Sequence, residues 1–221
     1  MSNETEGYWK VNREKKKEIT RRTIMEEGFK LYAEHGIEPV TLPEVADASI
    51  VGRATIFRYF NNKLEFVIAM AAWKWEEYIK EHDESIDKDV VQRMTGAEYL
   101  KFYLDAFLDL YRNHADLLRF NYNFNNFVRN EKCTPEQMQP YLQVVDKLGE
   151  GFHDLYERGI KDGTLSPEVP EKEMFSTTFH IMLAAVTRYA IGLVYVYETA
   201  DPEKELIRLE KMLLREFTRE A

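Results

Sequence analysis

Three side chains that can hydrogen bond share one arc of a short predicted helix near the N-terminus: Thr55, Arg58 and Tyr59. The opposite arc carries Ile56 and Phe60, which are four residues apart and are expected to face inward together. The outward arc begins with small residues and then offers a hydroxyl, a guanidinium and a phenol. Such a face suits a DNA major groove, because these groups can reach base edges and phosphates.

A second short helix is predicted directly before this one, and it begins after Thr41. Thr41 and Glu44 have the spacing of a capping box, in which each side chain bonds to the backbone of the other residue. The helix breaks at Ser49 and Ile50, and the next helix follows at once. Two short helices around a tight turn, over residues 42–60, form a helix-turn-helix pattern and indicate a DNA-binding regulator.

The segment 41–66 resembles the signature of the tetracycline-repressor (TetR) family of bacterial transcription regulators. The matching residues are Thr41, Val45, Ala46, Val51, Arg53, Thr55, Ile56, Phe57, Tyr59, Phe60 and Lys63. The family usually carries Gly at the turn, where this chain has Ile50. A β-branched residue is poorly suited to a positive φ, so we expect a differently built turn in which Gly52 absorbs the strain.

The resemblance implies a homodimer that places two recognition helices in successive major grooves of a roughly palindromic, double-stranded DNA operator. Arg53 and Thr55 are the predicted base contacts, since they come early in the recognition helix. The other predicted contacts hold phosphates and fix the register. They are backbone donors near Gly52 and the side chains of Thr41, Arg58, Tyr59 and Lys63.

The charge of the chain is unevenly distributed. The 221 residues carry a net charge of −9, yet residues 1–70 hold 11 basic and 11 acidic side chains, so the whole excess lies in residues 71–221. An acidic body with a locally basic N-terminal part is compatible with DNA binding. The single cysteine, Cys133, excludes an intrachain disulfide and fits a reducing cytoplasm, where we expect the protein to reside.

The pattern of apolar residues predicts an all-α protein of about nine helices. The first helix is predicted from about Glu14 to His35, with Gly36 as its stop, and Asn62 is predicted to cap the helix after the recognition helix. Further helices are predicted near 97–113, 115–130, 135–161, 171–198 and 202–219, with a loop that contains some local structure over 85–96. We expect a three-helix DNA-binding domain over residues 10–62, followed by a helical ligand-binding and dimerisation domain over residues 63–221.

Nine Phe and Tyr residues lie between Tyr99 and Phe127. Each one taken alone is better explained as core, but the cluster as a whole favours a cavity between helices. In the family that the chain resembles, the C-terminal helices enclose an effector pocket, which implies a pocket for a small-molecule effector here. The predicted ligand-binding residues are Tyr103, Phe107, Phe120, Asn123, Phe124, Phe127, His153, Tyr156 and Met182.

The last two helices carry more apolar positions than one buried face requires. On the final helix these are Leu206, Ile207, Leu209, Leu213, Leu214 and Phe217. On the preceding helix they are Met174, Thr178, Met182, Val186, Tyr189, Leu193 and Val196. Pairing with a second copy through residues 171–219 would bury them in a four-helix interface. Ordinary packing within one subunit is the alternative.

Catalytic, metal-binding and membrane functions find little support in the sequence. Glu150 and His153 form one Glu-x-x-His pair, whereas a di-iron bundle needs two such pairs and two further glutamates. The histidines lack zinc spacing, and no phosphate-binding glycine loop occurs. The longest apolar stretch, 181–197, is interrupted and too short for a typical membrane span. We therefore expect no enzyme, no cofactor, no metal and no membrane partner.

The sequence as a whole predicts a ligand-responsive transcription regulator. The resemblance implies that the protein represses transcription and that an effector relieves the repression. The alternative is a helical ligand-binding or partner-binding protein without sequence-specific DNA recognition. The departure at Ile50 is the sequence feature that supports this alternative.

Overall fold

The computed structural model describes residues 3–85, 87–193 and 201–219, with side chains from residue 13 onward, and these residues form ten α-helices. The all-α prediction is confirmed. The helices are α1 (Asn3–His35), α2 (Leu42–Ala48), α3 (Arg53–Tyr59), α4 (Lys63–Ser85), α5 (Lys88–Arg93), α6 (Gly96–Asn113), α7 (Ala115–Asn130), α8 (Pro135–Asp162), α9 (Glu171–Ala190) and α10 (Pro202–Phe217).

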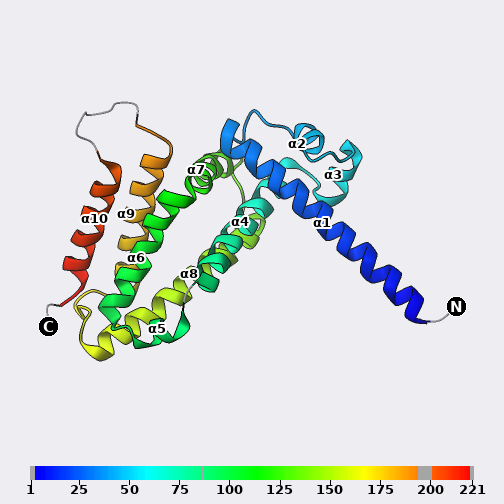
Figure 1. Ribbon diagram of the computed structural model, residues 1–221. Helices are drawn as coiled ribbons and strands as arrows, with labels where there is room; N and C mark the ends of the chain where they lie inside the picture. The colour runs from blue at the N-terminus through cyan, green and yellow to red at the C-terminus, as the bar shows by residue number, and fades with distance from the viewer. Residues whose placement is uncertain (1–2, 86, 194–200, 220–221) are drawn as a thin grey trace.

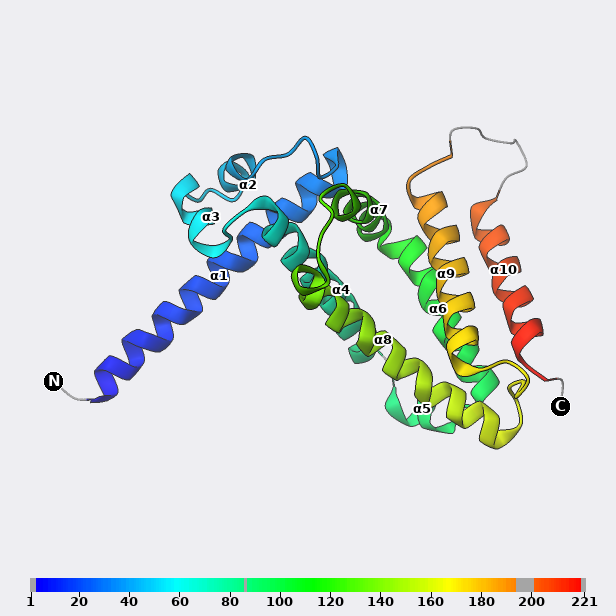
Figure 2. The ribbon, with the colours of Figure 1, turned by 180° about the vertical axis from the view of Figure 1, so that it is seen from behind.

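The helices gather into a head and a body (Figure 1). Helices α1, α2 and α3 lie together at one end, and α4 runs from α3 back into the body beside α8. In the reverse view, α9 and α10 stand side by side at the far edge of the body (Figure 2), and both contact α6. The N-terminal part of α1 projects away from the other helices in both views.

Local capping explains where several helices begin and end. The amide of Glu44 donates to the Thr41 hydroxyl and the Glu44 carboxylate accepts from the Thr41 amide, so the predicted capping box is confirmed. Asn62 accepts from the amide of Glu65 at 2.9 Å and caps α4, as predicted. Gly36 has φ +82° and ends α1 in the left-handed conformation that glycine tolerates best.

Two predicted boundaries and one predicted loop differ from the structure. Helix α1 begins at Asn3 instead of near Glu14. Helix α5 replaces part of the predicted loop; the Asp87 side chain caps it, but it has no buried residue and so leaves no apolar periodicity in the sequence. Helix α9 was predicted to reach residue 198, yet it ends at Ala190, and Gly192 then turns the chain with φ +90°. The predicted position of Val196 lies outside the described residues.

One continuous apolar core joins head and body. In the head, Tyr32, Val45, Ile56 and Phe66 are fully buried and hold α1, α2, α3 and the start of α4 together. The core continues where α1 packs on α7, and the rings of Phe29 and Phe120 are 5.3 Å apart there. The head therefore rests on the body through α7 as well as through α4. Within the described ranges, none of the helices combines the length and apolar character of a bilayer-spanning segment.

Candidate nucleic-acid interface and ligand cavity

Helices α2 and α3 are held at a fixed angle by a small apolar contact and a tight turn. Leu42 and Val45 of α2 and Ile56 of α3 are buried against the rest of the head. The amide of Val51 donates to the carbonyl of Ala46 at 3.0 Å across the turn. The outer surface of α3 is therefore left to solvent, and its exposed residues are Arg53, Ala54, Phe57 and Arg58.

The turn itself corrects the expectation about Gly52. Ile50 takes the left-handed conformation with φ 55°, whereas Gly52 is extended, with φ −63° and ψ 140°. The hydrogen bonds Ile50 N to Asp47 O and Val51 N to Ala46 O close the turn around residue 50. The strain therefore falls on Ile50, whose side chain is 94% exposed and gains little from packing.

Replacing Ile50 with Gly is expected to stabilise the protein by about 0.5–1 kcal/mol, because relief of the left-handed strain exceeds the extra chain entropy of glycine. Thermal and urea unfolding monitored by circular dichroism would measure the gain. Ile50→Ala is the matched control: it removes the same exposed side chain and keeps the Cβ atom, so it should gain less. A Gly variant less stable than the Ala variant would contradict the strain assignment.

Arg53 forms a bidentate pair with Asp47 across the turn. Its Nη2 and Nε lie 2.7 and 3.2 Å from the two carboxylate oxygens of Asp47, and both side chains are exposed. The hydrogen bond from Arg53 lowers the pKa of Asp47. The pair uses two of the five guanidinium N–H donors. Arg53 is thus held at the start of α3 with donors left for another acceptor.

Two of the predicted phosphate contacts already have partners inside the head. The Thr41 hydroxyl donates to the Glu44 carboxylate at 2.7 Å. The Lys63 ammonium donates to the carbonyl of Glu38 at 2.9 Å and lies 5.6 Å from the centre of the Phe127 ring, and burial lowers its pKa. An ammonium has three donors, so Lys63 could bind the Glu38 carbonyl and a phosphate at the same time. The phosphate contact stays a prediction.

The other predicted DNA contacts differ in exposure. Arg58 is exposed, while Thr55 and Tyr59 are half-buried. Phe57 was not among the predicted DNA contacts, although its side chain is 49% exposed. Phe57 and Arg53 are four residues apart and therefore lie on the same arc of α3. This spacing is the signal in the sequence that could have identified Phe57 as a candidate DNA contact.

Lys63→Ala should weaken binding to all DNA sequences and lower the slope of log affinity against log salt by about one unit if Lys63 contacts a phosphate. The measurement is binding to one duplex at several salt concentrations. Lys80→Ala removes an exposed lysine paired with Glu84 in the distal half of α4 and should leave the slope unchanged. An unchanged slope for Lys63→Ala as well would assign Lys63 to packing between head and body.

The body contains a cavity of about 220 Å³ between α4, α6, α8 and α9. Of the nine predicted ligand-binding residues, Tyr103 and Phe107 line it. Several lining residues were missed, most clearly Trp75, Tyr78, Ile79 and His82, which recur at three- and four-residue spacing along α4. That spacing was visible in the sequence, but nothing in it showed that this face of α4 meets α6 and α8.

The structure places the seven other predicted ligand residues elsewhere. Three are core aromatics of α7. Phe120 packs on Phe29 of α1, Phe124 packs on Tyr141 of α8, and Phe127 lies beside Lys63 at the start of α4. Asn123 lies near Gly36, and Met182 is fully buried. The hydroxyl of Tyr156 donates to the carbonyl of Val169 at 3.0 Å.

The remaining residue of that set, His153, is exposed and points to another helix. Its Nδ1 lies 3.0 Å from a carboxylate oxygen of Glu171, which raises the pKa of His153. It does not pair with Glu150 as a metal-binding Glu-x-x-His motif would require. Across the described part of the chain, no three His, Cys, Asp or Glu side chains gather as metal ligands would.

The proposed dimer helices bury much of their apolar surface within the subunit. On α9 the buried stripe is Met174, Thr178, Met182 and Val186, and on α10 it is Leu206, Leu213 and Phe217. These seven side chains are therefore buried by packing within one subunit, and pairing with a second copy through residues 171–219 stays a prediction. The spacing of four or seven residues keeps each stripe on one helix face. Ile181 and Met212 remain exposed, at 40% and 59%.

Comparisons with known proteins agree with this architecture. Residues 24–70 match the family model described as bacterial regulatory proteins, tetR family. Over 190 residues, the chain is 24% identical to the uncharacterized HTH-type transcriptional regulator YhgD of Bacillus subtilis (strain 168), with 85% of this chain and 90% of that protein covered.

Several solved structures share the fold. The transcriptional regulator FadR from Bacillus subtilis, in complex with stearoyl-CoA, has a TM-score of 0.65 at 18% identity, over 87% of this chain and 97% of that chain. A regulator from Saccharomonospora viridis in complex with choline has a TM-score of 0.67 at 16% identity, over 90% and 98%. The head therefore matches the tetR family of bacterial regulatory proteins over residues 24–70, and the whole chain shares the helical fold of these solved regulators.

Proposed function

We propose that the chain is a transcriptional repressor that binds a palindromic operator as a homodimer and is released by a small-molecule effector. The observation that carries this proposal is the position of α4. This helix begins at Lys63, directly after the recognition helix, and its later part, at Trp75 and Tyr78, lines the cavity of the body. One rigid element therefore borders both the DNA-reading helix and the ligand cavity.

On the DNA side, Arg53 and Thr55 would contact bases, because they lie in the first turn of α3. Phosphate contacts are proposed for the Gly52 backbone and for the side chains of Thr41, Arg58, Tyr59 and Lys63. Two heads would occupy half-sites whose centres are about 34 Å or a multiple apart. The regulator would act in the cytoplasm, where bacterial DNA lies, and as a member of a regulator family it is proposed to have no catalytic activity and no cofactor.

The proposed division is a DNA-binding domain over residues 10–62 and an effector-binding and dimerisation domain over residues 63–221. The homodimer is proposed to form through residues 171–219. The exposed side chains of Ile181 on α9 and Met212 on α10 support this, because large apolar side chains gain free energy when a second copy covers them.

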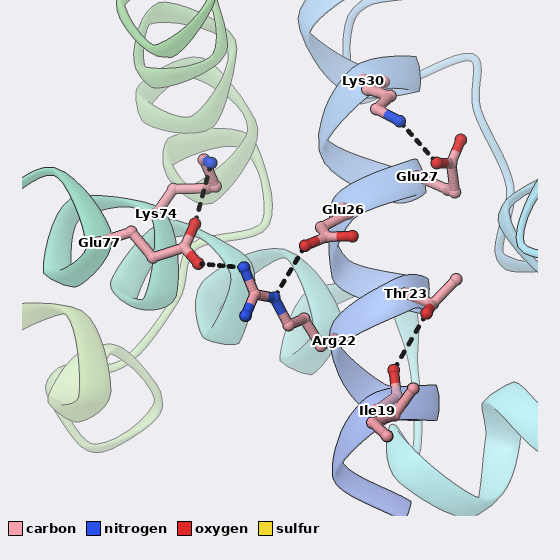
Figure 3. A network of polar contacts seen from close by, with 8 residues as sticks. All are labelled: Ile19, Arg22, Thr23, Glu26, Glu27, Lys30, Lys74 and Glu77. Carbon is pink, nitrogen blue, oxygen red and sulfur yellow. Dashed lines mark hydrogen bonds and ion pairs between the residues drawn. The ribbon is translucent and has the colours of Figure 1, made fainter. Parts of the chain in front are cut away.

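Ion pairs link α4 to α1 in the head and to α8 in the body, and Figure 3 shows the contact with α1. Glu77 of α4 lies 3.7 Å from Arg22 of α1, which also bonds to Glu26 at 2.8 Å. The adjacent residue, Glu76, pairs at 3.2 Å with Lys147 of α8, a residue that lines the cavity. A shift of α4 against α8 therefore changes contacts on α1 as well.

Such a shift releases DNA on one condition. The effector must bind the released arrangement more tightly than the DNA-bound one. The effector would then change the distance between the two heads of the dimer. Both heads must engage the operator together, so a changed distance would weaken operator binding. The complexes of relatives with stearoyl-CoA and with choline support a small-molecule ligand for this fold.

Selection of bound fragments from a random duplex library, followed by sequencing, tests the DNA-binding part. An enriched palindrome is expected, with half-site centres one helical turn or more apart. The enriched duplex then serves as the probe for effectors, which should lower its affinity. Equal binding of all sequences at physiological salt would instead support a ligand-binding or partner-binding protein without specific DNA recognition.

A further inference from the structure

The cavity of the body has a polar end, because α4 and α6 run along it in opposite directions. The hydroxyl of Tyr78 on α4 donates to the carbonyl of Ala106 on α6 at 2.9 Å. One turn further along α4, the ring of His82 lies 5.4 Å from that of Phe102, which is one turn earlier on α6. The end of α4 that carries Asp83 therefore lies against the beginning of α6. We propose that the cavity binds a protonated amine with a compact aromatic body, with the ammonium at Asp83 and the body among the rings farther in. This inference rests on the proposed ligand response and specifies the chemical class of the ligand.

The inner part of the cavity suits an aromatic body of limited size. Its lining there includes the buried side chains of Trp75 on α4 and of Phe107 and Leu110 on α6. The indole N–H of Trp75 is already bonded to Asn121 at 3.3 Å. A dry protein cavity of about 150 Å³ holds one benzene molecule, and this cavity has about 220 Å³. One ring with a short amine arm therefore fits, and the lining rings can meet it in offset or edge-to-face contacts.

The carboxylate of Asp83 lies at the opening of the cavity. Asp83 lines the cavity and also two neighbouring hollows on the surface, and its side chain is exposed, so it lies where the cavity meets solvent. Among the described residues it accepts no hydrogen bond and forms no ion pair. An ammonium is the natural partner for such a carboxylate, because a bond between two charged groups is stronger than a bond between neutral ones.

The cations near the cavity leave the charge of Asp83 unpaired. Two of the described residues that line the cavity carry a formal charge at neutral pH, Asp83 and Lys147. The ammonium of Lys147 is paired at 3.2 Å with Glu76, which lies about two turns, or roughly 10 Å, before Asp83 on α4. Lys88 and Arg158 border the hollow outside Asp83 but do not line the cavity itself. The lining therefore keeps one negative charge for a cationic ligand.

Two neutral acceptors line the same end of the cavity. The hydroxyl of Tyr99 and the ring nitrogens of His82 have no hydrogen-bond partner among the described residues. Burial raises the pKa of Tyr99, and the carboxylates of Asp154 and Asp83 raise it further, while Arg158 opposes them, so the phenol stays neutral. An ammonium has three N–H donors, a phenol and a neutral imidazole each offer an acceptor, and Asp83 offers the third. An anionic ligand would instead meet the like charge of Asp83.

Calorimetric titration of the full chain with four probes tests the inference. Phenethylammonium has a ring and a cation, phenethyl alcohol is its neutral counterpart, hydrocinnamate is an anion with the same ring, and butylammonium is a cation without a ring. The titration is run at mildly alkaline pH, where imidazoles are neutral and alkylammonium groups keep their proton. Phenethylammonium should bind most tightly, and its affinity should fall as salt is added, because salt screens an exposed carboxylate.

Two carboxylates on α4 provide a matched pair of variants. Asp83→Asn removes the charge and keeps the shape of the side chain. It should weaken phenethylammonium binding about three- to tenfold, remove most of the salt dependence and leave phenethyl alcohol binding unchanged. Glu84→Gln removes the neighbouring carboxylate, which is paired with Lys80 and does not line the cavity, and should leave the affinity of every probe unchanged.

Two glycines of α8 test whether the ligand lies inside the cavity. A Cβ atom at Gly151 or at Gly149 would meet no atom within 4 Å, but only Gly151 lines the cavity. Gly151→Leu should reduce the binding of phenethylammonium and of phenethyl alcohol, whereas Gly149→Leu should change neither. The pair separates binding in the cavity from pairing of an ammonium with the exposed carboxylate alone.

Equal or tighter binding of any of the other three probes would overturn the inference, and so would a lack of measurable phenethylammonium binding. Equal losses in Asp83→Asn and Glu84→Gln would assign the effect to general surface charge, and full binding by Gly151→Leu would place the amine outside the cavity. The outcome for the proposed function is separate. Phenethylammonium that binds as expected without lowering operator affinity leaves the ligand class standing and contradicts the proposed release of DNA by ligands of this class.

Discussion

Gly96→Ala is expected to lower the free energy of unfolding by about 3 kcal/mol or more, because overpacking against backbone cannot relax by moving a side chain. A Cβ atom on Gly96 would lie 2.0 Å from the Cα and 2.4 Å from the amide nitrogen of Gly159. This is the point where α6 begins against α8. The Gly96 amide donates there to the Asp162 carboxylate at 2.8 Å, and the Ala97 amide donates to the Thr164 hydroxyl at 2.9 Å. Helix α6 therefore cannot move away without losing these bonds.

Gly149→Ala is the matched control for that loss. Gly149 also lies in α8, but a Cβ atom there would meet no atom within 4 Å. Alanine should therefore stabilise the helix by up to about 1 kcal/mol. Urea unfolding followed by circular dichroism measures both variants. Similar stability changes for the two substitutions would show that α6 and α8 are not in backbone contact at Gly96.

Arg53→Ala should weaken operator binding about 5- to 150-fold and relax the preference at one base position, if Arg53 reads a base. The exposed position at the start of α3 and the donors left free by the pair with Asp47 are the reasons. Binding is measured against the enriched operator and against variants of each base pair. Uniform loss over all operator variants would instead assign Arg53 to a phosphate.

Two further variants separate the roles of the neighbouring charges. Arg58→Ala is the matched control for a phosphate contact. It should weaken binding to all DNA sequences alike and lower the slope of log affinity against log salt by about one unit. Asp47→Ala frees the Arg53 guanidinium, and should lose part of the same base discrimination if the pair orients Arg53. The double variant Asp47→Ala with Arg53→Ala should then bind no worse than Arg53→Ala alone. Additive losses would show that Asp47 acts independently.

Local patterns in the sequence predicted the head well. Thr41 and Glu44 are three residues apart, as are Asn62 and Glu65, and both pairs form the predicted caps. The inward pair Ile56 and Phe60 is buried as predicted. These interactions join residues within one helical turn, so their geometry follows from helix periodicity and needs no knowledge of the rest of the fold.

Ile50 shows where a local rule gave the wrong result. A β-branched residue was not expected at positive φ, yet it has φ 55°. The turn between α2 and α3 must let the two helices pack together with Val45 and Ile56 buried. Packing of the head therefore overrides the preference of one exposed residue, because burial of several side chains outweighs about 1–2 kcal/mol of backbone strain.

The sequence by itself determined the all-α fold, the helix-turn-helix with its caps, and the presence of an aromatic-rich body. Only the tertiary structure decided which aromatic residues surround the cavity. Phe107 lines it while Phe120 is core, although both are apolar positions on amphipathic helices. Helix periodicity shows which face of a helix is buried, but the neighbour that covers this face depends on contacts between distant segments, such as Tyr78 on α4 with Ala106 on α6.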